Sequence, residues 1–270
     1  MFLKTIILAG LTMGLTVQSV QTFSNTGTFP TGWSDFYVDG ASGNAASSST
    51  GSIAQVSNVF YDTAPAIKVT ATYEPNHQGL YHAEVHRANA YSKGDTGFYG
   101  FAFRLSQDWE FTPQSSFNIA QFIADFTDLP CDETYMPSSM IWISGNQLYS
   151  RVKTGNVCPV SEQQSNPFNS LATVTAGAWH KVVIQAKWRS DATGYYKIWL
   201  DGVSVLNKTS PAIATTVTDG RPFQFRVGLY ANGWKKPSEG GMKGNQPFRQ
   251  IWFDKIATGT TFADVDSDQW

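Results

Sequence analysis

Hydrophobic and polar residues alternate with a period of two along most of the chain, and short turn sequences separate the alternating segments. This period places successive side chains on opposite faces, which is typical of β-strands buried on one side. The predicted strands are 66–72, 96–105, 117–126, 140–144, 148–153, 179–187, 195–200, 203–206, 222–230 and 250–257. No long segment keeps the apolar stripe of a helix, so the pattern predicts an all-β protein.

The turns between these segments indicate how the strands are connected. Asp201-Gly202 is a strong two-residue hairpin signal, and Gly145-Asn146 joins another pair of predicted strands. Many short strands joined by hairpins favour two packed antiparallel sheets, as in a β-sandwich or jelly roll. The low-complexity stretch 41–52 is expected to be a surface loop.

The first residues resemble an export signal, and we do not expect them to belong to the folded domain. A short basic start at 1–4 precedes an apolar run at 5–17, and small residues near Ser19 allow cleavage. A membrane anchor is the alternative, but a spanning helix needs about 20 apolar residues and this run is shorter. We therefore expect a signal peptide at 1–19, a single domain at 20–270, and a secreted protein.

Composition and charge narrow the class of partner. Charged residues make up 15% of the chain and aromatic residues 14%, whereas average soluble proteins carry about 25% charged residues. Few charges and many aromatics predict a large buried core and argue against disorder. The net charge of −2 provides no cationic surface for nucleic acid or an anionic membrane, so neither is expected as a partner.

Two sequence features agree with export. Cys131 and Cys158 are the two cysteines of the chain, and in an oxidising compartment they most simply form one disulfide. Asn207-Lys208-Thr209 is an N-glycosylation sequon after a predicted strand, so Asn207 is expected to carry a surface glycan in a eukaryotic host.

The segment 81–87 places three ionisable groups together. On a strand, His82, Glu84 and His86 share one face. The two histidines are about 13 Å apart on such a strand, too far to share a zinc ion through bonds of about 2.1 Å. His82 and Glu84 could still share an ion, but a third ligand is not obvious. The other interpretations are a solvated strand face or a binding site.

Two further strands carry polar groups that suit an anionic ligand. Gln121 lies within an otherwise apolar strand, where an unpaired buried amide costs about 1–3 kcal/mol. In the segment 222–234 the alternation places one set of residues on a common face, and this set comprises Gln224, Arg226, Gly228, Tyr230 and Asn232. Arg226 offers a planar fork for carboxylates, and Tyr230 offers a proton donor or, as phenolate, a base. Gly228 is expected to leave room for a ligand, and Lys235 follows at the strand end.

Other catalytic classes lack their residues in this chain. Glu84 has no acidic neighbour two positions away on its strand, so the carboxylate pair of a glycosidase is not apparent. No Gly-x-Ser-x-Gly elbow is present for a nucleophilic triad. The amide-rich, tyrosine-bearing face with its arginine therefore favours an acidic sugar polymer as partner.

These strands resemble the polysaccharide lyases built on concanavalin-like jelly rolls, and most closely the fungal glucuronan lyases. The segment 82–86 stands where related alginate lyases carry Arg-x-Glu-x-Arg, with both arginines replaced by histidine. The segment 121–123 keeps the Gln of Gln-x-His, and 224–232 keeps the Gly and Tyr of a third motif with Arg for Lys. The segments 179–181 and 194–202 also resemble paired strands of these enzymes. The departures make alginate a less suitable substrate than glucuronan.

The resemblance implies β-elimination across C4–C5 of a β-1,4-linked glucuronate, in a concave cleft of the jelly roll. Gln121, Arg226 and His82 are expected to neutralise the uronate carboxylate. Tyr230 is expected to act as both base and acid, with Arg226 favouring its phenolate, and His82 or His86 is the alternative base. The expected substrate-binding residues are Glu84, His86, Gln224, Asn232 and Lys235.

The resemblance also implies a structural calcium ion on the convex side, far from the cleft, and no organic cofactor. Asp254 is the expected carboxylate ligand, with Asn25 or Asp39 as further candidates. The protein is expected to be a monomer. An alginate lyase, a lectin-like module without catalysis and a hydrolase of neutral glucans remain as alternative functions.

Overall fold

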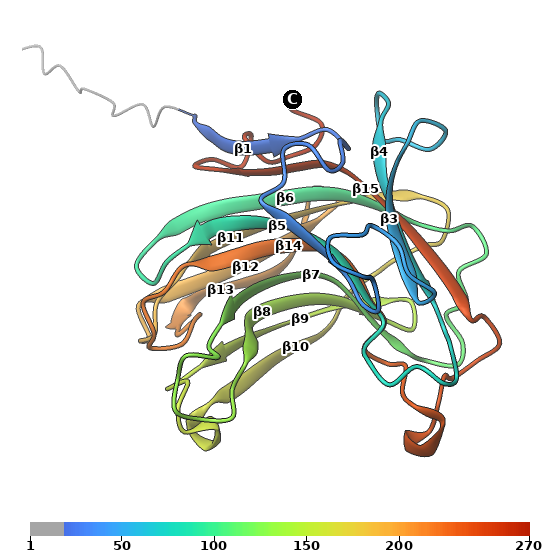
Figure 1. Ribbon diagram of the computed structural model, residues 1–270. Coiled ribbons are helices and arrows are strands. Elements are labelled where there is room, and N and C mark those ends of the chain that lie inside the picture. The colour runs from blue at the N-terminus through green and yellow to red at the C-terminus, as the bar shows by residue number, and fades with distance from the viewer. Residues whose placement is uncertain (1–18) are drawn as a thin grey trace, which may run out of the picture.

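The protein consists of two antiparallel β-sheets packed face to face, as Figure 1 shows in a computed structural model that describes residues 19–270. The predicted signal peptide therefore lies outside the described residues, except for Ser19. The all-β jelly-roll expectation is confirmed. None of the helices within residues 19–270 is long and apolar enough to cross a membrane.

The first sheet has eight strands and forms the outer layer of the molecule in Figure 1. Its path is β13 (Val203–Ile213), β12 (Gly194–Leu200), β11 (Trp179–Lys187), β6 (Thr96–Leu105), β15 (Phe248–Gly259), β4 (Ala66–Thr72) and β3 (Gly51–Val56). The strand β1 (Gln21–Asn25) pairs with β15 off this path. Asp201 and Gly202 both adopt positive φ between β12 and β13, as the predicted two-residue hairpin requires.

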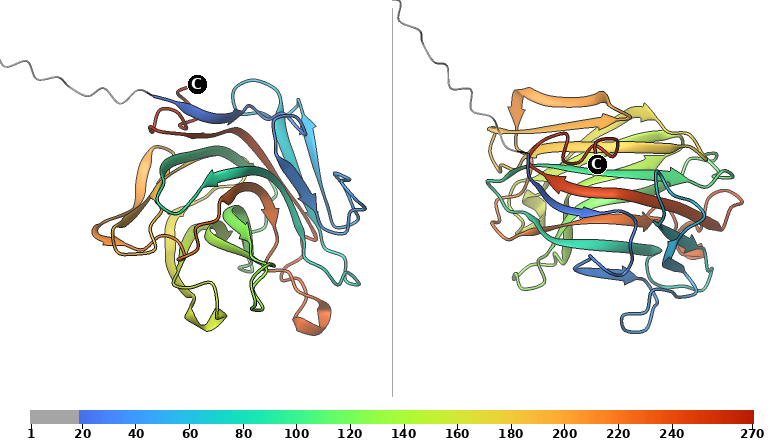
Figure 2. Two further views of the ribbon diagram at one scale, coloured as in Figure 1. Left: turned by 60° about the vertical axis from the view of Figure 1, so that its left-hand side comes forward. Right: turned by 90° about the horizontal axis from the view of Figure 1, so that it is seen from above.

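The second sheet has seven strands and lies beneath the first, and both curve in the same sense (Figures 1 and 2). Its order is β10 (Gln164–Thr173), β9 (Gln147–Thr154), β8 (Tyr135–Ser144), β7 (Ser116–Asp125), β14 (Phe223–Tyr230), β5 (His82–Tyr91) and β2 (Asp35–Val38). Its inner face packs on the first sheet. Its outer face is the concave surface of the molecule, and this face carries the candidate site.

Aromatic side chains fill the space between the sheets. Trp188 stacks on Tyr91 with ring centroids 3.9 Å apart, and Phe122 stacks on Phe225 at 5.0 Å. All four are at most 2% exposed, and burying an aromatic side chain of this kind contributes roughly 1.5–3 kcal/mol. This packing holds β5, β7 and β14 in place from behind and leaves their alternate residues free for the concave face.

The strands that the sequence did not predict are mostly at sheet edges. β10 is largely exposed and contains Pro167, so it shows no clear alternation. β13 continues to Ile213, beyond the predicted end at 206, so Asn207 lies within a strand and not after it; its side chain is exposed. The predicted loop at 41–52 ends two residues early, because Gly51 and Ser52 begin β3.

The predicted disulfide is present between Cys131 and Cys158. It links the loop between β7 and β8 to the segment that follows β9. The two residues are 27 apart in sequence, and closing a loop of this length stabilises the fold by about 3–4 kcal/mol on the loop-entropy model. The disulfide thus ties together two loops at one end of the concave sheet.

Candidate active site

The three predicted site segments lie on adjacent strands of the concave sheet. β14 runs between β5 and β7, and its register pairs Arg226 with both His86 and Gln121. Tyr230 pairs with His82 in the same way. Directly paired residues of antiparallel strands point to the same face, so residues from three distant segments meet on one surface. The sequence prediction that these groups converge is borne out by this register.

A buried carboxylate connects the groups. Glu84 is 0% exposed, and its Oε2 accepts a hydrogen bond from His82 Nε2 at 2.6 Å and one from Gln121 Nε2 at 2.7 Å. Arg226 Nη1 lies 3.9 Å from the same oxygen. A buried charge is costly unless it is paired and hydrogen-bonded. Here Oε2 accepts two hydrogen bonds, from β5 and β7, and lies near the positive charge of Arg226 on β14, whereas Oε1 is buried without a hydrogen-bond partner.

These donors keep Glu84 ionised. Burial alone would raise its pKa, but the charge and hydrogen bond of His82 and the charge of Arg226 lower the pKa to about 2. An ionised carboxylate only accepts hydrogen bonds, so His82 must place its proton on Nε2. In the neutral imidazole the lone pair is then on Nδ1, and the ring lies 5.1 Å from the Tyr230 ring, centroid to centroid. Glu84 therefore sets the tautomer of His82 beside Tyr230.

Tyr230 differs from the expectation in its acidity. Burial raises its pKa, and the negative charges of Glu84 and Asp39 raise it further. The expected lowering by Arg226 is wrong, because burial is the main influence on this pKa and the carboxylates across the strands raise it further. Tyr230 therefore carries its proton in the free protein.

The space above Gly228 is also used differently from the expectation. A Cβ at Gly228 would lie 2.2 Å from the Ala83 carbonyl oxygen and 2.8 Å from Glu84 Cγ. The missing side chain therefore makes room for Glu84 and the β5 backbone, and not for a ligand. Glycine at this position is what allows the carboxylate to lie beneath the site.

His86 lies at the base of the same face. Burial lowers its pKa to about 3, and the charge of Arg226 acts in the same direction. Both of its ring nitrogens are buried without a hydrogen-bond partner, and Asp35 Oδ2 lies 3.9 Å from Nδ1. A histidine with so low a pKa is a weak base, so the alternative role of His86 in proton abstraction loses support.

The remaining predicted substrate-binding residues lie around this centre. Gln224 Oε1 accepts a hydrogen bond of 2.8 Å from Arg226 Nε, which fixes the guanidinium. Asn232 is partly exposed, and its Oδ1 is buried without a partner. Lys235 is exposed in the loop after β14. Tyr135, which was not predicted, lies under the Arg226 guanidinium at 5.5 Å.

The sequence also missed a second polar group beside the site, at the end of β2. Asp39 Oδ1 accepts a hydrogen bond of 2.8 Å from the Tyr37 hydroxyl, and His77 Nε2 lies 2.5 Å from Asp39 Oδ2. Burial and the Asp39 hydrogen bond raise the pKa of Tyr37 to about 12. The Tyr37 ring lies 5.3 Å from that of His82. Nothing in the sequence pattern joins these residues, because β2 is short and at an edge.

The candidate calcium ligands are separated. Asp254 is fully buried on β15 of the other sheet, and its two oxygens accept backbone N–H groups of Tyr61 and Lys255 at 2.9 and 2.7 Å. Asp39 follows β2 of the concave sheet, where its side chain contacts Tyr37 and His77, so the structure does not bring it to Asp254. The Asn25 side-chain oxygen, Oδ1, accepts a hydrogen bond from the Thr28 backbone N–H. Within residues 19–270 no three His, Cys, Asp or Glu side chains cluster to hold a metal ion, so the residues do not form a carboxylate-rich site.

The fold and this site define a class of protein that sequence comparison also identifies. The family model described as polysaccharide lyase matches residues 24–257. The chain belongs to this family. A comparison with curated protein sequences gives no significant match.

Solved structures supply the individual relatives. The chain is 48% identical to the endo-β-1,4-glucuronan lyase of the fungus Trichoderma reesei, with 93% of this chain and 100% of that chain covered and a TM-score of 0.84. It shares 10% identity with a marine alginate lyase from Aplysia kurodai, over 90% of this chain and 100% of that one, with a TM-score of 0.58. The cellulose-induced protein Cip1 matches at 14% identity over 88% and 97%, with a TM-score of 0.52. The last two likenesses show the fold alone.

From the burial of His86 we can predict how the free energy of unfolding depends on pH. Folding lowers its pKa from the ordinary 6.5 to about 3, so below pH 6.5 the unfolded chain binds a proton that the folded protein does not. Stability is therefore complete above pH 6.5 and falls as the pH drops toward 3. Glu84 contributes a loss only below its ordinary pKa of 4.5.

Between about pH 6 and pH 5, His86→Gln should lose less stability than the wild type, by up to about 1.4 kcal/mol per pH unit. Urea denaturation at several pH values measures the difference. The other three histidines are common to both proteins and act as the internal control. Identical slopes for the two proteins would show that His86 is not held neutral by the fold.

Proposed function

We propose that this polysaccharide lyase cleaves β-1,4-linked polyglucuronate by β-elimination, in an endo-acting manner. The observation that carries the proposal is the joining of His82, Gln121 and Arg226 around buried Glu84, with Tyr230 beside them. The 48% identity to a structure titled as an endo-β-1,4-glucuronan lyase supports the same substrate. In the reaction the C5–H and C4–O4 bonds break, a C4=C5 double bond forms, and O4 leaves with a proton.

Proton loss from C5 requires that the charge on the uronate carboxylate be neutralised, because negative charge develops there in the transition state. Arg226 supplies a fixed positive charge whose orientation is set by Gln224. Gln121 donates one amide hydrogen to Glu84 and keeps a second for the substrate. His82 borders the same position. We assign the neutralisation to Arg226 and Gln121, with His82 beside them.

The proton transfers are assigned to Tyr230 and His82. In β-1,4-glucuronate H5 and O4 lie on the same side of the ring, so one group can remove H5 and protonate O4. Tyr230 is this group, and since its pKa is raised, its own proton must first move to a neighbouring base. His82 Nδ1 is suited to accept it, with the imidazolium stabilised by Glu84. Glu84 is completely buried, so we assign it the orientation of His82 and Gln121 in place of the predicted substrate contact.

The substrate test incubates the protein with glucuronan, polymannuronate or polyguluronate. Each reaction is monitored by the ultraviolet absorbance of the 4,5-unsaturated product. The wild type is expected to act fastest on glucuronan and to release mixed oligomers early, as an endo-acting enzyme does. Tyr230→Phe should lose at least about 10²–10⁴-fold in kcat, with polymer binding and circular dichroism unchanged. A preference for polymannuronate would make the protein an alginate lyase, and binding without product would make it a lectin-like module. Wild-type turnover by Tyr230→Phe would remove Tyr230 from the mechanism.

We also infer that the protein is exported, with 1–19 removed and a glycan at Asn207. The disulfide and the exposed position of the sequon support this. N-terminal sequencing of protein from the culture medium should begin close to Val20, and deglycosylation should lower its mass. Asn207→Gln, whose mass should not change on deglycosylation, is the control. Retention of residues 1–19 in the medium would contradict the cleavage.

The calcium ion near Asp254 remains a prediction that the donor set supports weakly, since both carboxylate oxygens already accept backbone N–H groups. If calcium is structural, a chelator should lower the melting temperature of the wild type, and added calcium should restore it. Asp254→Asn should then melt at the same temperature with and without chelator. An unchanged melting temperature of the wild type would show that no structural calcium is bound.

A further inference from the structure

A row of side chains crosses the concave sheet at the level of Tyr230. The strand register pairs His82 with Tyr230, Tyr230 with Asn118, Asn118 with Trp142, and Trp142 with Tyr149. Directly paired residues share a face, so the row leads from the catalytic centre on β14 across β7 to β8 and β9. Its far end is aromatic.

Trp142 and Tyr149 form a stacked pair at this end. Their ring centroids are 5.6 Å apart with an interplanar angle of 16°, and both side chains are half-buried on the concave face. The Ser170 hydroxyl donates to the Tyr149 hydroxyl at 3.2 Å. On either side of Trp142, Ile141 and Ile143 point to the core and are at most 1% exposed. The aromatic pair therefore contributes little to the core and presents apolar surface to the cleft.

The spacing of this pair matches a polymeric substrate. Neighbouring strands are about 4.8 Å apart, which places Trp142 about 10 Å and Tyr149 about 14 Å from Tyr230 across the sheet. One sugar of a β-1,4-linked chain is about as long as one strand spacing. A chain crossing the strands would therefore place its second and third sugars from the reacting one over the aromatic pair.

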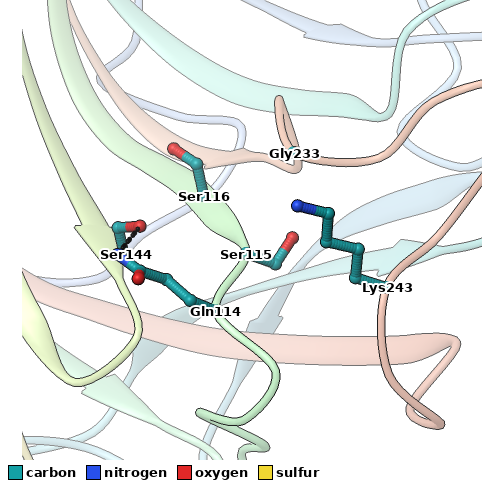
Figure 3. Close-up of a pocket in the computed structure, with 6 residues that line it drawn as sticks. All are labelled: Gln114, Ser115, Ser116, Ser144, Gly233 and Lys243. Atoms are coloured by element: carbon teal, nitrogen blue, oxygen red, sulfur yellow. Dashed lines mark hydrogen bonds between the residues drawn. The ribbon is translucent and has the colours of Figure 1, made fainter. Parts of the chain in front are cut away.

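A polar hollow adjoins the pair on the same face. Ser116 and Ser144 are directly paired, two residues along their strands from Asn118 and Trp142, and they line a hollow of about 350 Å³. In Figure 3 the Lys243 side chain points into this hollow from the loop between β14 and β15. The Gln114 amide donates to the Ser144 hydroxyl at 2.9 Å, as the dashed line shows. The hollow thus offers hydroxyl groups and an ammonium group next to the aromatic surface.

We propose that Trp142, Tyr149 and the Lys243 hollow form a distal uronate subsite, two to three sugars from the cleaved bond. This inference rests on the proposed lyase function and adds a binding role for residues away from the reacting sugar. The aromatic faces take the C–H face of the sugar ring, as aromatic side chains do with apolar surfaces. The Lys243 ammonium and the serine hydroxyls take the carboxylate and hydroxyl groups. A uronic acid polymer needs this combination, whereas a neutral glucan needs only the aromatic part.

The test measures affinity and kinetics as a function of substrate length. In the Tyr230→Phe background, calorimetry with size-defined oligoglucuronates should show that Trp142→Ala weakens binding of long oligomers about tenfold. The affinity for the shortest oligomer that binds should be the same with and without Trp142→Ala. In the active enzyme Trp142→Ala should raise KM for the polymer about tenfold, with kcat lowered much less. Lys243→Gln should weaken binding of long oligomers and reduce the salt dependence of that binding.

Tyr195→Ala is the matched control, because Tyr195 is a partly exposed tyrosine on β12 of the convex sheet; it should leave all these values unchanged. Tyr149→Ala repeats the test if Trp142→Ala does not fold. The subsite is disproved if the wild type cleaves glucuronan while Trp142→Ala and Tyr149→Ala keep its KM and length dependence. If instead the wild type cleaves no polyuronate, the proposed function itself fails.

Discussion

The negative charge of Glu84 is the constraint on which the rest of the site depends. A carboxylate without solvent contact needs hydrogen bonds and a nearby opposite charge. Here His82 on its own strand and Gln121 on β7 donate to it, and Arg226 on β14 places a positive charge 3.9 Å away. Compensation of one buried charge therefore positions three side chains that the proposed mechanism uses. The same contacts explain the low pKa of Glu84 and the tautomer of His82. The contacts that compensate the charge of Glu84 are therefore the same contacts that orient the side chains of the site.

The jelly roll makes this arrangement possible by using the two faces of each strand differently. The inward residues of β5, β7 and β14 are large and apolar and pack against the outer sheet, as Phe122 does on Tyr99 of β6. The outward residues are then held by a rigid backbone and not by loops, which suits a site that must keep its geometry. At Gly228 the outward side chain is missing altogether, and Glu84 lies in the space that it would fill.

Much of this could be predicted from the sequence, and the failures have a common cause. The period-two pattern predicted ten strands and the three site segments, because alternation is local and strong where one face is buried. It missed short or exposed edge strands such as β2 and β10, where alternation is weak. The acidity of Tyr230 was predicted wrongly because the sequence shows Arg226 on the same strand but neither the burial of the phenol nor Glu84 and Asp39 across the strands. The role of Gly228 failed for the same reason, since its neighbours are also on another strand. Contacts between strands are what a single sequence does not display.

The central claim is that ionised Glu84 organises the catalytic groups without touching the substrate, and turnover by Glu84→Gln tests it most directly. The substituted amide keeps the shape but loses the charge, and it can donate to His82, so His82 no longer holds its proton on Nε2. The account predicts that kcat falls by about 10²–10⁴-fold while the affinity for glucuronan and the circular dichroism spectrum stay close to those of the wild type. A variant that retains the wild-type kcat would contradict it.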